Sequence, residues 1–140
     1  MKKKLLFLTL LTIELSSVEL VVIGDKNFPK KSLTASEIKA IFLDKRRFIN
    51  RKKILVMNYK SNHSLRQCFE REILKKRERS LERYWRKAYY QGKRPPKVVS
   101  SEEMLFLYLD GVHPAIGYSD FNDTLDKEVT ILYKIECDNS

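Results

Sequence analysis

The residues best suited to chemistry lie in one short stretch, where an apolar run gives way to a polar turn and then to a helix. The side chains there that could hold an anion are Ser61, Asn62, His63, Ser64 and Arg66. The first turn of a helix presents unpaired N–H groups and the positive end of its dipole, which favour an anion. Arginine adds a planar guanidinium suited to phosphate or sulfate. The stretch predicts either an oxyanion site or only a well-capped helix, because Ser and Asn are ordinary N-cap residues.

Catalytic and metal-binding patterns do not stand out elsewhere in the sequence. His63 and His113 are the two histidines, and neither has a cysteine or carboxylate at metal-ligand spacing. The four glycines do not form a phosphate-binding loop. We therefore expect no enzymatic activity, no cofactor and no metal ion.

The N-terminus has the pattern of a secretory signal peptide. Lys2, Lys3 and Lys4 precede an apolar run that ends near Glu14, with small residues at positions 16 and 17. The run is too short for a typical membrane-spanning helix. We predict a signal peptide over residues 1–17 and a mature domain over residues 18–140, located in the periplasm or secreted. An uncleaved anchor and a buried first helix are the alternatives.

Length and charge limit the possible partners. The 140 residues suffice for one domain, and 43% apolar residues allow a real core. The net charge of +10 becomes +8 without the three lysines and one glutamate of residues 1–17. Outside the inner membrane such a charge favours small anions, acidic lipids or an acidic protein, so no nucleic acid partner is expected.

The two cysteines would meet an oxidising compartment after export. Cys68 falls on the apolar side of its helix, and Cys137 is one of the last four residues of the sequence. We expect a free thiol in the core and another on a loose tail, with a disulfide between them as the alternative.

The order of elements predicts an α/β layered domain. Expected strands cover residues 19–24, 53–58, 115–120 and 128–135, and expected helices cover residues 34–42, 61–74, 77–92 and 101–109. Thr34 and Glu37 have the spacing of a capping box. In residues 77–92 an apolar stripe recurs at helical spacing and predicts core packing, with Tyr90 off the stripe.

Four segments together resemble a known family. They are residues 33–48 (LTASEIKAIFLDKRRF), 58–74 (NYKSNHSLRQCFEREIL), 81–103 (LERYWRKAYYQGKRPPKVVSSEE) and 115–120 (AIGYSD). They are similar to the small, single-domain relatives of phosphate ABC transporter substrate-binding proteins. The resemblance implies a three-layer fold, a sheet flanked by helices, like one lobe of a type II periplasmic binding protein. It also implies inorganic phosphate or a similar oxyanion as ligand and a membrane transporter or another protein as a possible partner.

The resemblance places the family's anion-binding loop on Ser61 to Arg66, with Ser32 and Asn27 as weaker candidates. Asp44 stands where the family has glycine, His63 can be aligned with a family serine, and Pro114 precedes the AIGY motif. The function implied is a periplasmic binding module with weak oxyanion affinity. The alternative is a periplasmic accessory or interaction protein that keeps the fold without binding the ligand.

Overall fold

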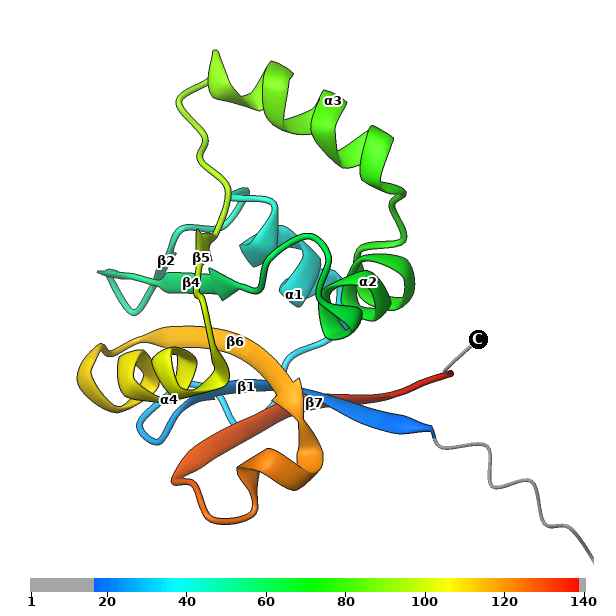
Figure 1. Cartoon of the computed structure of the whole chain (residues 1–140). Helices are drawn as coiled ribbons and strands as arrows, with labels where there is room; N and C mark the ends of the chain where they lie inside the picture. Colours follow the sequence, from blue (N-terminus) through cyan, green and yellow to red (C-terminus); the bar gives the residue numbers. More distant parts are fainter. Residues whose placement is uncertain (1–16, 139–140) are drawn as a thin grey trace, which may run out of the picture.

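A five-stranded mixed sheet forms the centre of the computed structural model, which describes residues 17–138 (Figure 1). Its strands, in spatial order, are β5 (Lys97–Val98), β4 (Leu55–Asn58), β6 (Ala115–Asp120), β1 (Val18–Asp25) and β7 (Val129–Cys137). β4 runs parallel to β5 and β6, whereas β1 is antiparallel to β6 and β7. The strands predicted from the apolar runs are all present.

β1 lies inside the sheet and is covered on both faces. Its residues Leu20 to Ile23 have no exposed surface. A strand buried on both faces needs a continuous apolar run rather than an alternating one, and this run is what the sequence has.

Helices cover both faces of the sheet, which confirms the predicted three-layer architecture. Gly117 of β6 faces α4 (Glu102–Gly111), so closely that a Cβ atom there would lie 2.6 Å from Leu105 Cδ1. The next residue, Tyr118, points to the opposite face because side chains alternate along a strand. There its ring packs against Phe42 of α1 (Ala35–Phe42) and Phe69 of α2 (Ser64–Phe69), with centroid distances of 6.1 and 4.2 Å.

Local signals in the sequence define several of the connections. The Glu37 N–H donates to Thr34 Oγ1 and the Thr34 N–H donates to Glu37 Oε1, both at 3.1 Å, which confirms the capping box. Strands β2 (Phe48–Ile49) and β3 (Lys52–Lys53) form a hairpin whose two turn residues both have positive φ, as a tight hairpin turn requires. α2 continues into a π-helical turn, η1 (Glu70–Leu74), and a 3-10 turn, η2 (Phe121–Thr124), joins β6 to β7.

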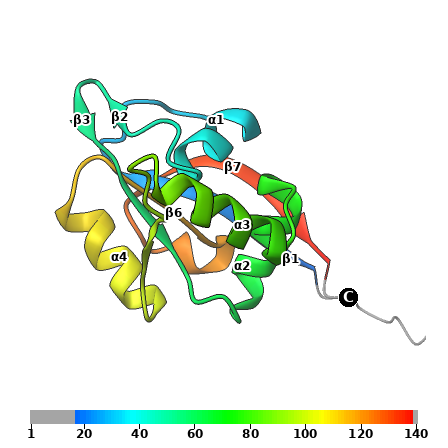
Figure 2. The same cartoon turned by 90° about the horizontal axis from the view of Figure 1, so that it is seen from above.

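Helix α3 (Glu78–Tyr89) is the outermost element, above α1 and α2 in Figure 1 and in front of the sheet in Figure 2. The prediction that its whole apolar stripe packs into the core is wrong. Leu81 and Ala88 are buried, but Tyr89 is 59% exposed. The reason is that α3 rests on the end of α1 rather than on the sheet: the Tyr84 hydroxyl donates to the Leu43 carbonyl at 2.5 Å. Only one edge of the stripe is therefore covered.

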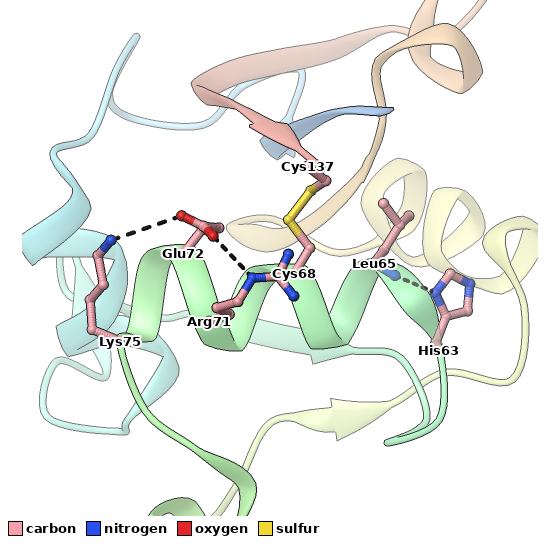
Figure 3. The surroundings of a disulfide bond; sticks show 7 residues. All are labelled: His63, Leu65, Cys68, Arg71, Glu72, Lys75 and Cys137. Carbon is pink, nitrogen blue, oxygen red and sulfur yellow. Dashed lines mark hydrogen bonds and ion pairs between the residues drawn. A yellow bond between two sulfur atoms is a disulfide. The ribbon is translucent and has the colours of Figure 1, made fainter. Parts of the chain in front are cut away.

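The two cysteines form a disulfide, so the expectation of two free thiols is wrong. Cys137 is the last residue of β7 rather than part of a loose tail, and both cysteines are buried. Figure 3 shows the bond between α2 and the end of β7, across a sequence separation of 69 residues. It fixes the helix of the candidate anion site to the sheet.

The predicted signal peptide lies outside the described residues, apart from Ser17. Within residues 17–138, no helix is both long and apolar enough to span a lipid bilayer.

Candidate functional site

The predicted anion cluster lies at the carboxyl end of β4, where the chain turns into α2. Ligands of α/β proteins commonly bind outside the carboxyl ends of parallel strands, and β4 has parallel neighbours on both sides. The His63 N–H donates to the Lys60 carbonyl at 2.9 Å and closes the turn, and His63 is the N-cap of α2. The turn itself is therefore well fixed.

The imidazole of His63 is used by the protein's own structure. Its Nδ1 atom accepts a hydrogen bond from the Leu65 N–H at 3.1 Å (Figure 3). Its ring stacks on Tyr59 at a centroid distance of 4.3 Å. Burial lowers the pKa of His63, so the ring is neutral at pH 7. Only Nε2 remains as a ring donor, and His63 brings no charge to an anion.

Arg66 is held by two partners. Its Nη1 donates to the Tyr59 carbonyl at 2.7 Å, and its Nε donates to Glu70 Oε1 at 3.4 Å. The two side chains are 22% and 14% exposed. Burial raises the pKa of Glu70, and the nearby Arg66 guanidinium opposes this shift. An incoming anion would therefore share the guanidinium with a carboxylate.

Arg66 and Ser61 line a groove of about 870 Å³ between α3 and the body of the domain. A volume of this order is typical of ligand-sized pockets. Most of its wall is apolar or aromatic: Phe42, Leu43, Leu74, Leu81, Trp85, Tyr89, Tyr90, Pro95, Pro96 and Val98. Its ionisable side chains are Arg66, Glu70, Glu78, Glu82, Arg86 and Lys93. The groove thus joins a small polar end at β4 to a long aromatic wall.

His63 and Ser64 line a different cavity, of about 270 Å³, beside the disulfide. Arg71 and four carboxylates line it as well: Glu102, Asp120, Asp123 and Asp138. Burial and the neighbouring Asp123 raise the pKa of Glu102 to about 7. Carboxylates on this side disfavour a second anion, so the structure separates the predicted cluster into two halves.

The remaining predicted residues lie apart from both cavities. Asn62 is exposed in the turn and lines neither cavity. Ser32 is exposed before α1 and also lines neither, and the Asn27 N–H donates to Asp25 Oδ2 at 3.1 Å in the loop after β1. Among residues 17–138, no group of histidine, cysteine and acidic side chains is arranged to hold a metal ion.

Asp44, which the sequence resemblance aligns with a glycine, turns away from the groove. Its φ of 58° lies in the left-handed region that glycine favours and aspartate tolerates. Its carboxylate accepts from the Arg94 N–H and pairs with Arg47, both at 2.9 Å. The charge of Asp44 is therefore used to hold the chain after α3, and it does not line the groove that contains Arg66.

The aromatic wall of the groove is the feature that sequence reasoning missed. Trp85 and Tyr89 have the helical spacing of core residues, and this periodicity gave no sign that they face an open groove. Two signals pointed to exposure: Tyr90 falls off the stripe, and the rigid Pro95–Pro96 pair keeps the following chain extended.

Comparison with known proteins relates the fold to phosphate-binding transport proteins. No family model matches the chain, and no curated protein matches it. One similar solved structure is from Clostridium perfringens, described as a phosphate ABC transporter substrate-binding protein with bound phosphate. It has a TM-score of 0.68 and 22% identity over 86% of this chain. Another is an ABC-type phosphate transport receptor from Vibrio cholerae, with a TM-score of 0.66 and 18% identity over 84% of this chain.

The match is to part of each larger protein. The chain spans 46% of the length of both solved structures. The resemblance predicted from the four sequence segments is thereby confirmed for the fold. The chain has the periplasmic-binding-protein-like fold of about half of a phosphate-binding transport protein.

Proposed function

We propose that this chain is a binding module of the periplasm, or of the space outside the cell, with weak affinity for phosphate or a similar oxyanion. The observation that carries the proposal is the position of Arg66 and Ser61 at the carboxyl end of β4, inside a ligand-sized groove. The solved structures with this fold are named for phosphate transport, and one of them contains phosphate. The role is binding rather than catalysis.

The contacts of Arg66 make the affinity weak. Glu70 forms an ion pair with the same guanidinium, so a bound anion would be repelled by a nearby carboxylate. At a separation of about 6 Å and an intermediate effective dielectric constant, this repulsion is roughly 1–3 kcal/mol. We expect a dissociation constant in the millimolar range, about −4 kcal/mol.

The buried disulfide supports a location outside the cytoplasm. Disulfides persist in oxidising compartments such as the periplasm. The positively charged and apolar N-terminal pattern of residues 1–17 points the same way. Cell fractionation with an antibody to the untagged chain tests this: a purely cytosolic protein with two free thiols would contradict it.

Calorimetric titration with phosphate and with sulfate tests the binding. Arg66→Ala should abolish a saturable heat that the wild type gives. Arg71→Ala is the matched control, because Arg71 lies in the same helical segment, carries the same charge and does not line the groove. No saturable heat up to about 10 mM, or an equal loss in both variants, would overturn the proposal.

Glu70 gives the binding a predicted pH dependence. As the pH falls through the raised pKa of Glu70, the carboxylate is neutralised and Arg66 becomes free to bind. Sulfate keeps its charge over this range, so its affinity should rise by about tenfold. Glu70→Gln should bind sulfate more tightly at neutral pH and lose the pH dependence. A wild-type affinity that does not change with pH would refute the role of Glu70.

The alternative function is an interaction protein that keeps the fold without the ligand. Its support is that His63 caps α2 and Arg66 is paired with Glu70, so two of the predicted ligand residues already have structural roles. Calorimetry of the wild type and Arg66→Ala distinguishes the two functions: saturable heat that the variant loses supports oxyanion binding, and no saturable heat supports the interaction protein.

A further inference from the structure

The groove face of α3 has its charges segregated along the helix. Glu78 and Glu82 lie in the first half, and Arg86 lies in the second, with Lys93 beyond the helix end. Trp85 lies between the acidic and the basic residues. Within residues 17–138, neither Glu82 nor Arg86 takes part in an ion pair. The helix therefore offers a surface that is acidic, then aromatic, then basic.

Large apolar side chains are exposed along the same surface. Tyr90 is 89% exposed, and Val98 of the edge strand β5 is 52% exposed. Both line the groove together with the half-exposed Tyr89. A contiguous apolar surface of this kind marks an interaction site, and Tyr and Trp are enriched in protein interfaces. α3 is the outermost helix in Figure 1, and its residues Glu82 and Arg86 are exposed.

We propose that this surface binds a second copy of the same chain, with the two α3 helices antiparallel about a two-fold axis near Tyr84. In this arrangement Glu82 of each copy meets Arg86 of the other. The two residues are four positions apart on one helix face, so both ion pairs form together. Such an interface is self-complementary, as a two-fold dimer requires.

The charge order selects a second copy over other occupants. A uniformly acidic partner would face Glu78 and Glu82 with like charge, and a uniformly basic partner would face Arg86 and Lys93. A partner with the reversed order of charges matches both halves, and an antiparallel α3 has this order. With the axis near Tyr84, Trp85 lies between the two ion pairs, and Tyr90 of one copy lies opposite Glu78 of the other.

The size of the helix sets the expected affinity. The 12 residues of α3 give a contact about 18 Å long. With the neighbouring Pro95–Val98 segment, this supports a small interface on the order of 1,000 Å². We expect a reversible dimer with a dissociation constant of roughly 1–100 µM.

Charge reversal tests the pairing in sedimentation equilibrium on the purified full chain. Glu82→Arg and Arg86→Glu each place like charges opposite one another twice, and each should raise the dimer dissociation constant about tenfold or more. The double variant restores both pairs with reversed sign and should return to within about threefold of the wild type. Arg83→Glu is the control for charge alone, because Arg83 is on α3 but does not line the groove.

Each outcome decides the proposal. A monomer at every concentration up to about 200 µM overturns it, whatever else binds in the groove. A dimer that Arg83→Glu weakens as much as Arg86→Glu, or that the double swap fails to restore, places the interface elsewhere. Circular dichroism of each variant establishes that it is folded. The test is independent of phosphate, so the oxyanion proposal can fail while this one holds.

Discussion

Reduction of the disulfide should cost this protein much of its stability. The bond joins Cys68 of α2 to Cys137 at the end of β7, across a sequence separation of 69 residues. The loop-entropy relation for a loop of this length gives about 4 kcal/mol at 25 °C. Because domains of this size have net stabilities of roughly 5–15 kcal/mol, the loss would bring the reduced protein close to unfolding.

Urea denaturation with and without a reductant measures this loss. The midpoint should fall when the bond is reduced, and the slope should rise because the reduced unfolded chain exposes more surface. The double variant Cys68→Ala with Cys137→Ala is the control, since its midpoint should not respond to the reductant. Thiol titration of the unfolded chain should find no free thiol before reduction and two after it.

A difference of less than about 1 kcal/mol between the oxidised and reduced forms would refute this reasoning. It would mean that the unfolded chain already keeps α2 close to β7, or that strain in the native bond offsets the entropy. Free thiols in protein taken from the periplasm would contradict the pairing itself.

Three further predictions concern stability. Gly117→Ala should destabilise by roughly 1–3 kcal/mol in urea melts, because its Cβ would lie 2.6 Å from Leu105 Cδ1. Asp44→Ala should cost about 1–3 kcal/mol, because it strains a positive φ and removes two contacts, whereas Asp44→Asn should cost less than about 1 kcal/mol. The pKa of Glu102 is raised from 4.5 to about 7, first by burial and then by Asp123, so the folded state binds the extra proton between these values. The free energy of unfolding should fall by about 1 kcal/mol as the pH rises through this window, after solvent screening, and Glu102→Gln should flatten the pH profile of the melts.

The parts of the fold that the sequence predicts well are those with local causes. The capping box of α1 needs only two side chains three residues apart. The burial of β1 follows from an uninterrupted apolar run. In each case the physical reason lies within a few residues, so the pattern is sufficient.

The exposure of α3 and the disulfide have causes far away along the chain. Helical periodicity shows which side of α3 is apolar, but the degree of coverage depends on where the helix docks. α3 docks on the end of α1 through the bond from Tyr84 to the Leu43 carbonyl. The pairing of Cys68 with Cys137 likewise requires knowing that β7 ends beside α2.

The sequence predicted one anion site from a cluster of suitable residue types. In the structure these residues line two separate cavities. Ser61 lies in the turn before α2 and Arg66 lies two positions after Ser64 on α2, so these side chains point in different directions: Ser61 and Arg66 line the groove, and His63 and Ser64 line the acidic cavity. The sequence did contain one indication that Arg66 is paired within its own helix. Glu70 follows Arg66 at the four-residue spacing that pairs opposite charges on a helix.

The position of Glu70 has consequences for both proposals. A guanidinium that is paired with a carboxylate of its own helix binds an anion weakly, and it binds more tightly when a proton from solvent neutralises that carboxylate. The groove that contains it also bears the aromatic and charged face of α3, with balanced charges along its length. Strong phosphate binding would need a net positive pocket, whereas a balanced, aromatic surface suits a protein partner. The Glu70→Gln variant distinguishes anion binding from dimer formation. It should tighten sulfate binding while leaving the Glu82–Arg86 contacts of the dimer unchanged.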